Sequence, residues 1–123
     1  MFRIHKGRWI IKEYTLSANV TVAAGDFIYP DPSNAGQVTI ADSTAGNLLG
    51  IAVKDYSSSS STQTIKVFVP LEDTCEIEGP IESGTFTSAD VNKFCDLNSE
   101  DGVAIDTASK KHLWVVGLSL IHI

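Results

Sequence analysis

The chain lacks several features that would assign it to a common class of protein. Nowhere in its 123 residues is there an apolar run of the roughly 18 residues that a membrane-spanning helix needs. The first residues do not combine a charged segment, an apolar run and a small-residue cleavage site, so we expect no signal peptide. These absences favour a protein that is made and used without export through a membrane.

Cysteine is also scarce, because the chain has only Cys75 and Cys95. They are too far apart for a CxxC motif, and in a reducing compartment two buried thiols are favoured over a disulfide. A bridge between them stays open if their strands are neighbours.

Cations are rare outside the N-terminus. The first twelve residues contain four cations and no acid, whereas residues 13–123 set five lysines against all fifteen acids, and the net charge is −6. An acidic body is a poor ligand for nucleic acid, since such binding depends largely on neutralising phosphates. We therefore expect no nucleic-acid partner and no membrane partner.

The sequence shows no residue pattern typical of catalysis, metal binding or cofactor binding. No serine stands in a Gly-x-Ser-x-Gly elbow, and the three histidines are scattered (His5, His112, His122). The acidic loops at residues 31–36 and 96–102 lack ligands that a calcium loop requires, and no local pair of zinc ligands or glycine-rich phosphate loop is present. We expect a protein that is not an enzyme and holds no metal or cofactor.

The hydrophobic pattern predicts an all-β fold, a small barrel or sandwich of short strands. Residues 64–69 alternate strictly, with three aliphatic side chains on one face (Ile65, Val67, Val69). Phe68 lies on the opposite face, which indicates that a neighbour covers it. Further strands are predicted at residues 9–16, 20–22, 27–29, 37–40, 48–53 and, in part, 72–82.

The segments between these strands carry their own signals. Gly50, inside the strand at residues 48–53, indicates a bulge or a close backbone approach. The serine run at residues 57–61 is expected to be a mobile hairpin tip, since it has nothing apolar to bury. One short helix, of two turns at most, is predicted over residues 87–94, with Thr87 as its cap and Asp90 near its positive end.

Two stretches, about residues 24–53 and 89–119, are loose copies of one β unit. Each begins near an acid (Asp26, Asp90), passes through an acidic turn that ends in glycine, and closes on an apolar strand around a glycine (Gly50, Gly117). An Asp-Ser/Thr turn precedes each closing strand, at residues 42–43 and 106–107. We expect a basic N-terminal arm at residues 1–13 and a single β domain at residues 14–123 that contains both pseudo-repeats.

Three features favour partner binding. The arm combines cations with tryptophan, residue types that anchor protein interfaces, and its predicted partner-binding residues are Arg3, Lys6, Arg8, Trp9 and Lys12. The alternating C-terminal segment at residues 118–123 would aggregate as an open edge, so either the chain's own barrel or a second subunit should cover it. An acidic body with a basic arm also suits head-to-tail or ring assembly.

The turn at residues 24–28, the strand at 49–55 and the serine-rich tip resemble the small head-decoration proteins of tailed bacteriophages. Residues 88–93 and 115–117 resemble them too, and the likeness covers about residues 14–120, although the basic arm matches no motif of that family. The resemblance implies a β-rich, non-enzymatic subunit that is made in the host cytoplasm and binds the outside of the virion capsid. It also implies a homotrimer that clamps neighbouring copies of the major capsid protein. On this interpretation Phe68 and Trp114 lie inside the barrel or in the trimer seam.

Two other functions stay open from the residues. One is another virion or tail-associated β module, such as a tail-tube, fibre-base or head-completion protein. The other is a small carbohydrate-binding β-sandwich, in which Tyr29 and Tyr56 would present their rings beside Asp31 and Asp55.

Overall fold

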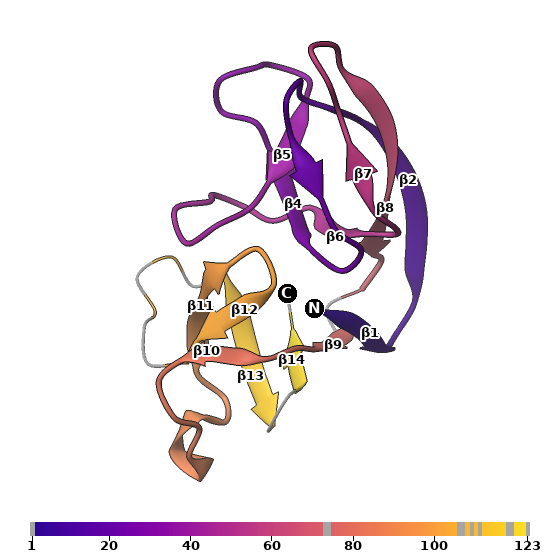
Figure 1. Ribbon diagram of the computed structural model, residues 1–123. Helices are drawn as coiled ribbons and strands as arrows, with labels where there is room; N and C mark the ends of the chain where they lie inside the picture. Colours follow the sequence, from indigo (N-terminus) through magenta and orange to yellow (C-terminus); the bar gives the residue numbers. More distant parts are fainter. Residues whose placement is uncertain are drawn as a thin grey trace.

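The structure is a computed structural model that describes residues 2–72, 75–105, 108, 110, 112–117 and 120–122. Its elements are fourteen β-strands and one short 3₁₀ turn (Figure 1). In chain order they are β1 (Arg3–Lys6), β2 (Trp9–Leu16), β3 (Thr21–Val22), β4 (Phe27–Pro30), β5 (Val38–Ile40), β6 (Gly50–Ala52), β7 (Tyr56–Ser57), β8 (Gln63–Pro70), β9 (Glu76–Glu78), β10 (Ile81–Ser83), η1 (Ser88–Asp90), β11 (Phe94–Ser99), β12 (Gly102–Ala104), β13 (Leu113–Gly117) and β14 (Leu120–His122). The predicted all-β class is confirmed. Within the described residues no helix has the length and apolarity needed to cross a bilayer.

The first half of the chain closes a barrel of five strands in the order β2-β5-β4-β6-β8. The alternation predicted for β8 is confirmed, since Ile65 and Val67 are buried in the barrel interior and Lys66 is exposed. Other aliphatic side chains of the interior come from the remaining strands of the barrel and from β3, and they are Leu16, Val22, Ile28, Val38 and Ala52. The barrel therefore has a core of its own.

A seven-stranded sheet forms the second half, in the order β1-β9-β14-β13-β11-β12-β10. Its first strand comes from the N-terminus, so residues 3–6 lie against β9 rather than in a separate arm. The boundary predicted at residue 13 falls inside β2, because β2 runs unbroken from Trp9 to Leu16 along β8.

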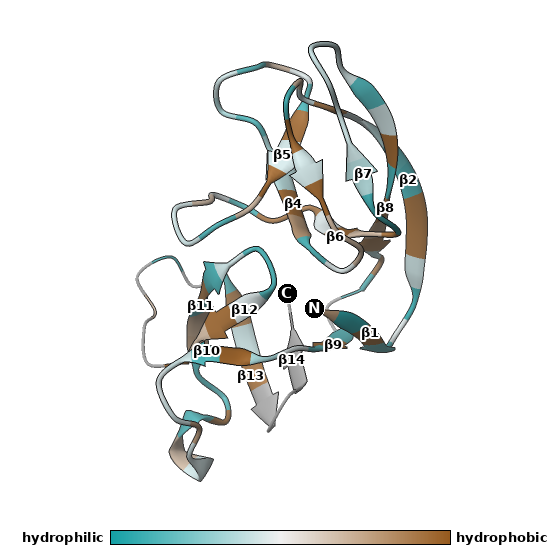
Figure 2. Cartoon of the chain, in the orientation of Figure 1, coloured by the Kyte–Doolittle hydropathy of each residue, from teal (hydrophilic) through white to brown (hydrophobic). Residues whose placement is uncertain are grey.

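A second core joins the barrel to the seven-stranded sheet. Phe27 and Ile51, on the outer surface of the barrel, pack with sheet residues such as Leu97 and Leu113. Phe68 packs partly against this core, which explains the predicted cover over its face. Figure 2 shows hydrophobic segments in both halves, on β4 and β5 and on β10–β12. The two halves therefore share a buried apolar interface.

Phe2 is the N-terminal element of the shared core. Its side chain is only 1% exposed and meets the Phe27 ring edge-on, with 4.6 Å between the ring centroids. A Cβ at Gly79 would overlap the Phe2 ring, so glycine is needed there to let the ring in. The predicted N-terminal arm is thus packed into the shared core through Phe2, its first described residue.

The two pseudo-repeats have the same strand order. In residues 24–53, β4 lies between β5 and β6 and is antiparallel to both. In residues 89–119, β11 lies in the same way between β12 and β13. Each central strand follows a tight turn whose third residue has a positive φ, 85° at Gly25 and 70° at Asn92.

The positions of these turns change which residues of the two repeats correspond to each other. The structure matches Gly25 with Asn92 and Phe27 with Phe94, whereas the sequence comparison matched Asp26 with Asp90. Since Phe27 is opposite Ile51 and Phe94 is opposite Trp114, the same match makes Trp114 the counterpart of Ile51. The predicted match of Gly50 with Gly117 is therefore wrong by four positions. Glycine and asparagine both tolerate a positive φ, so the geometry is kept without the same letters.

Several local predictions are also corrected. The helix predicted over residues 87–94 is a single 3₁₀ turn, Ser88–Asp90, because the chain enters the positive-φ turn at Asn92 directly afterwards. Trp114 does not lie inside the barrel, since it is on the outer face of the sheet and 36% exposed. Ser58 is buried rather than mobile, and its hydroxyl donates to the carbonyl of Ser17 at 2.6 Å.

Three further predictions concern the end of the chain, the cysteines and Gly50. Residues 120–122 form β14 between β9 and β13, so the chain covers this segment itself. The predicted turn at 106–107, and residues 118, 119 and 123, lie outside the described residues. Cys75 and Cys95 are both free and buried, the first of the two alternatives. A Cβ at Gly50 would overlap the carbonyl oxygen of Phe68, so the predicted close approach is confirmed.

Candidate partner-binding surfaces

The structure places three of the four N-terminal cations beside acids of the same chain. The pairs are Arg3 with Glu78 at 2.6 Å, Lys6 with Glu76 at 3.7 Å and Arg8 with Glu72 at 3.6 Å. All three cationic side chains stay at least 68% exposed. Exposed pairs of this kind contribute at most about 1 kcal/mol each, so they fix the cations only weakly. The net positive charge predicted for the arm is nevertheless largely balanced within the fold.

Trp9 and Lys12 occupy different environments on β2. Trp9 is half-buried, packs against the shared core and donates its indole N–H to the carbonyl of Lys6 at 3.1 Å. Lys12 is exposed, and within the described part of the chain no acid lies within ion-pair distance of it. Of the five predicted partner-binding residues, Lys12 is therefore the cation whose charge the fold leaves unmatched.

An exposed aromatic pair lies on the outer face of the seven-stranded sheet. Phe94 on β11 and Trp114 on β13 are directly opposite each other, and their rings meet edge-on with 4.8 Å between centroids. They are 41% and 36% exposed, whereas their counterparts in the first repeat, Phe27 and Ile51, are at most 2% exposed. The repeated unit thus has the same apolar position buried in one copy and partly exposed in the other.

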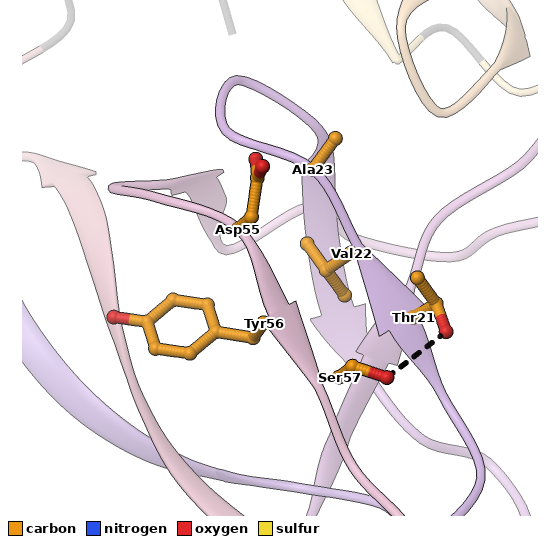
Figure 3. Close-up of a pocket in the computed structure, with 6 residues that line it drawn as sticks. All are labelled: Thr21, Val22, Ala23, Asp55, Tyr56 and Ser57. Carbon is orange, nitrogen blue, oxygen red and sulfur yellow. Dashed lines mark hydrogen bonds between the residues drawn. The ribbon is translucent and has the colours of Figure 1, made fainter.

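A shallow pocket of about 290 Å³ lies beside the two-stranded sheet of β3 and β7. Figure 3 shows its lining residues, with the Thr21 and Ser57 hydroxyls 3.5 Å apart across the strands. Asp55 also lines it, and its carboxylate accepts the N–H of Ala24 at 2.8 Å. Its lining therefore combines hydroxyl groups and a carboxylate with apolar side chains and the ring of Tyr56.

The tyrosines do not form the flat exposed platform that carbohydrate binding would need. Tyr56 is 7% exposed, and its hydroxyl accepts the backbone N–H of Lys66 at 2.8 Å. Tyr29 is half-buried and packs against the shared core. Asp31 is engaged in its own loop, where it accepts hydrogen bonds from Ser17 and Asn34 that lower the pKa of its carboxyl group. These side chains hold the fold together at the positions where the sequence left a sugar site open as an alternative.

Asp26 is a buried carboxyl group at the junction of the two halves. It is 5% exposed and accepts the N–H of Ala23 at 2.9 Å, while the N–H of Phe27 next to it donates to the carbonyl of Glu100 at 3.0 Å. Burial raises the pKa of Asp26 to about 6, and the charges of Glu100 and Asp101 act in the same direction. The hydrogen bond from Ala23 opposes this shift. The junction is therefore sensitive to pH.

His112 also joins the two halves. It is 8% exposed, and its Nδ1 accepts the N–H of Leu97 at 3.0 Å while its Nε2 lies 2.8 Å from the carbonyl of Ala45, in the segment between β5 and β6 of the first half. Nδ1 must be unprotonated to accept, so the ring is neutral with its proton on Nε2. Because both ring nitrogens are engaged, His112 has a structural role, and the described residues contain no group of three possible metal ligands.

Comparison of the chain with protein-family models, with curated protein sequences and with solved structures found no match. Sequence reasoning missed Phe94 and placed Trp114 in the barrel or a subunit seam, because alternation alone does not say which face of a strand a second layer will cover. Their counterparts Phe27 and Ile51 are buried, so the match between the repeats carries no signal that Phe94 and Trp114 are exposed.

Proposed function

We propose that this chain is a non-enzymatic structural protein that binds the outer surface of a tailed-bacteriophage capsid. As a homotrimer it holds neighbouring copies of the major capsid protein together. It is made in the host cytoplasm and located on the exterior of the virion. The proposal joins the resemblance of residues 14–120 to head-decoration proteins with the surfaces described above.

The observation that carries the proposal is the exposed Phe94–Trp114 pair. The equivalent position in the first repeat is covered by the second half of the molecule, as the burial of Phe27 and Ile51 shows. Large aromatic side chains at an open position of this kind are typical of the anchors of protein interfaces. Burying such a side chain stabilises a complex by about 1.5–3 kcal/mol relative to leaving it exposed.

The scaffold suits adhesion for a second reason. The barrel has an apolar core of its own, and a shared core fixes the two halves to each other. A rigid scaffold loses little conformational freedom on binding, which favours affinity. In a trimer, each further contact forms at high effective concentration, so three modest contacts give tight binding without a new type of interaction.

Binding to undecorated capsids, measured by cosedimentation, tests this function. We expect the wild-type protein to sediment with the capsids, and Trp114→Ala to bind at least tenfold more weakly. Leu71→Ala is the matched control, because Leu71 is 53% exposed, and it should bind like the wild type. Equal binding by both variants would remove the aromatic pair from the interface, and no binding by the wild type would refute the function. Light scattering tests the oligomer separately: the proposal expects three times the 13.2 kDa of one chain.

A further inference from the structure

Among the strands of the described residues, none lies beside one edge of β2 over most of its length. Along its other edge, β2 pairs with β8 at every residue from Trp9 to Leu16. On the open side it meets β5 only at Leu16, which is opposite Val38. Figure 1 shows β2 as the long strand at the margin of the barrel. Residues before Leu16 therefore present a free strand edge to solvent.

The pairing pattern identifies the backbone groups on this edge. The N–H of Leu71 donates to the carbonyl of Arg8 at 3.0 Å, so Arg8 and Leu71 are a hydrogen-bonded pair. In an antiparallel ladder such pairs alternate, so the even-numbered residues of β2 bond to β8 and the odd-numbered ones face away. Ser17 agrees with this, because its N–H donates in the opposite direction to Val38 at 2.9 Å. The N–H and C=O groups of Ile11 and Glu13 therefore point out from the free edge.

Two side chains give this edge a distinct chemical character. Ile11 is 54% exposed, the most exposed of the large hydrophobic residues in the described part of the chain. Lys12, next to it, is the exposed cation without an ion pair noted above. A strand added here would place an apolar residue against Ile11 and gain from an acid against Lys12, since directly opposite residues interact across strands.

Two of the two-fold arrangements that would place a second copy of the chain on the edge bring like charges together. The two-fold arrangement that joins Ile11 of one copy to Glu13 of the other sets two copies of Lys12 against each other. The arrangement centred one residue further along sets two copies of Glu13 against each other. Like charges directly opposite are destabilising, and charges on edge strands are a common protection against self-association.

We propose that the free edge of β2 is a docking site for an extended segment of another protein. The segment adds a strand antiparallel to β2, with an apolar residue opposite Ile11 and an acidic residue opposite Lys12. Hydrogen bonds to the backbone of Ile11 and Glu13 give affinity, and the side chains give specificity. The site is independent of the aromatic pair, and it does not require the partner to be a capsid.

A synthetic peptide tests the site on the intact chain. The probe is an octapeptide of alternating valine and threonine with one central glutamate, and the comparison peptide has lysine instead of the glutamate. In amide NMR titrations we expect the N–H groups of Ile11 and Glu13 to shift and to gain protection from exchange, while that of Lys12, which faces β8, changes little. The glutamate peptide should bind at least threefold more tightly than the lysine peptide. Equal affinities, shifts confined to other strands, or no binding at millimolar peptide would overturn the proposal.

Two variants of one residue provide the sharpest contrast. Ile11→Pro removes the outward N–H and leaves the ladder to β8 intact, since proline is tolerated on an edge strand where its N–H would face solvent. We expect it to weaken peptide binding at least tenfold, while Ile11→Val binds within twofold of the wild type. Lys12→Glu keeps the backbone and should reverse the preference between the two peptides, which guards against a folding defect in the proline variant. Retained binding by Ile11→Pro with no reversal by Lys12→Glu would refute the site, whereas capsid binding by the wild type would be unaffected by that outcome.

Discussion

Replacing Asp26 with asparagine should change how the stability of the protein depends on pH. In the folded protein the pKa of Asp26 is raised from 3.8 to about 6, so the folded state holds its proton more firmly than the unfolded state. Stability from this group is therefore fully present below pH 3.8 and is lost as the pH rises through about 6. A difference of about two pKa units corresponds to a loss of about 3 kcal/mol.

The variant isolates this contribution. In Asp26→Asn, the side-chain oxygen can still accept the N–H of Ala23, but no charge is buried when the pH rises. We expect the variant and the wild type to have similar free energies of unfolding at pH 4. By pH 7.5 the variant should be more stable by about 3 kcal/mol, the full linkage contribution of the raised pKa.

Urea unfolding followed by tryptophan fluorescence between pH 4 and 8 measures this difference. The relevant quantity is the free energy of the variant minus that of the wild type, because other groups titrate equally in both and cancel. Asp55→Asn is the matched control, since Asp55 is an exposed carboxylate that also accepts a backbone N–H, and its difference should be small. A difference for Asp26→Asn that stays constant with pH, or that grows towards low pH, would refute the reasoning.

Three further substitutions test the packing. Phe2→Ala should lower the free energy of unfolding by about 3–5 kcal/mol, as deletion of a fully buried aromatic ring does, whereas Arg3→Ala should lower it by less than about 1 kcal/mol. Urea unfolding measures both variants, and equal effects would mean that the Phe2 side chain does not anchor the N-terminus. Gly50→Ala should destabilise the barrel by more than about 2 kcal/mol, as other overpacked cores are destabilised, because a Cβ there would overlap a backbone carbonyl oxygen. Gly46→Ala is the control for thermal unfolding and should be near neutral, since a Cβ at Gly46 meets open space. His112→Phe removes one hydrogen bond between the halves, to the carbonyl of Ala45, and one within the second half, from the Leu97 amide. It should lower stability by about 2–4 kcal/mol, with faster hydrogen exchange at the Leu97 amide, and an unchanged exchange rate would contradict its structural role.

The fold class could be predicted because alternation is local. Strand β8 alternates cleanly, so its buried face was evident from residues 64–69 alone, and Gly50 marked a close approach in a strand. These features depend on residues close in the sequence.

What the sequence left undetermined depends on contacts between distant segments. Phe2 and Trp9 look like exposed anchors in an N-terminal arm, but β1 pairs with β9, more than 70 residues away, and this contact buries Phe2 in the shared core. Trp114 looks like a core residue, yet the barrel packs on the opposite face of its sheet, the face that carries Leu113 and Val115, so Trp114 stays exposed. Alternation shows which residues share a face, and only the arrangement of layers decides whether the face is covered.

The most direct test of the proposed function is a saturation binding measurement of the purified protein on undecorated phage heads. Adhesion as a trimer predicts saturable binding in which three copies of the chain occupy each site on the head surface. It also predicts that the decorated heads withstand heating that disrupts the undecorated ones. Binding that never saturates, or saturable binding with no gain in the stability of the heads, would contradict it.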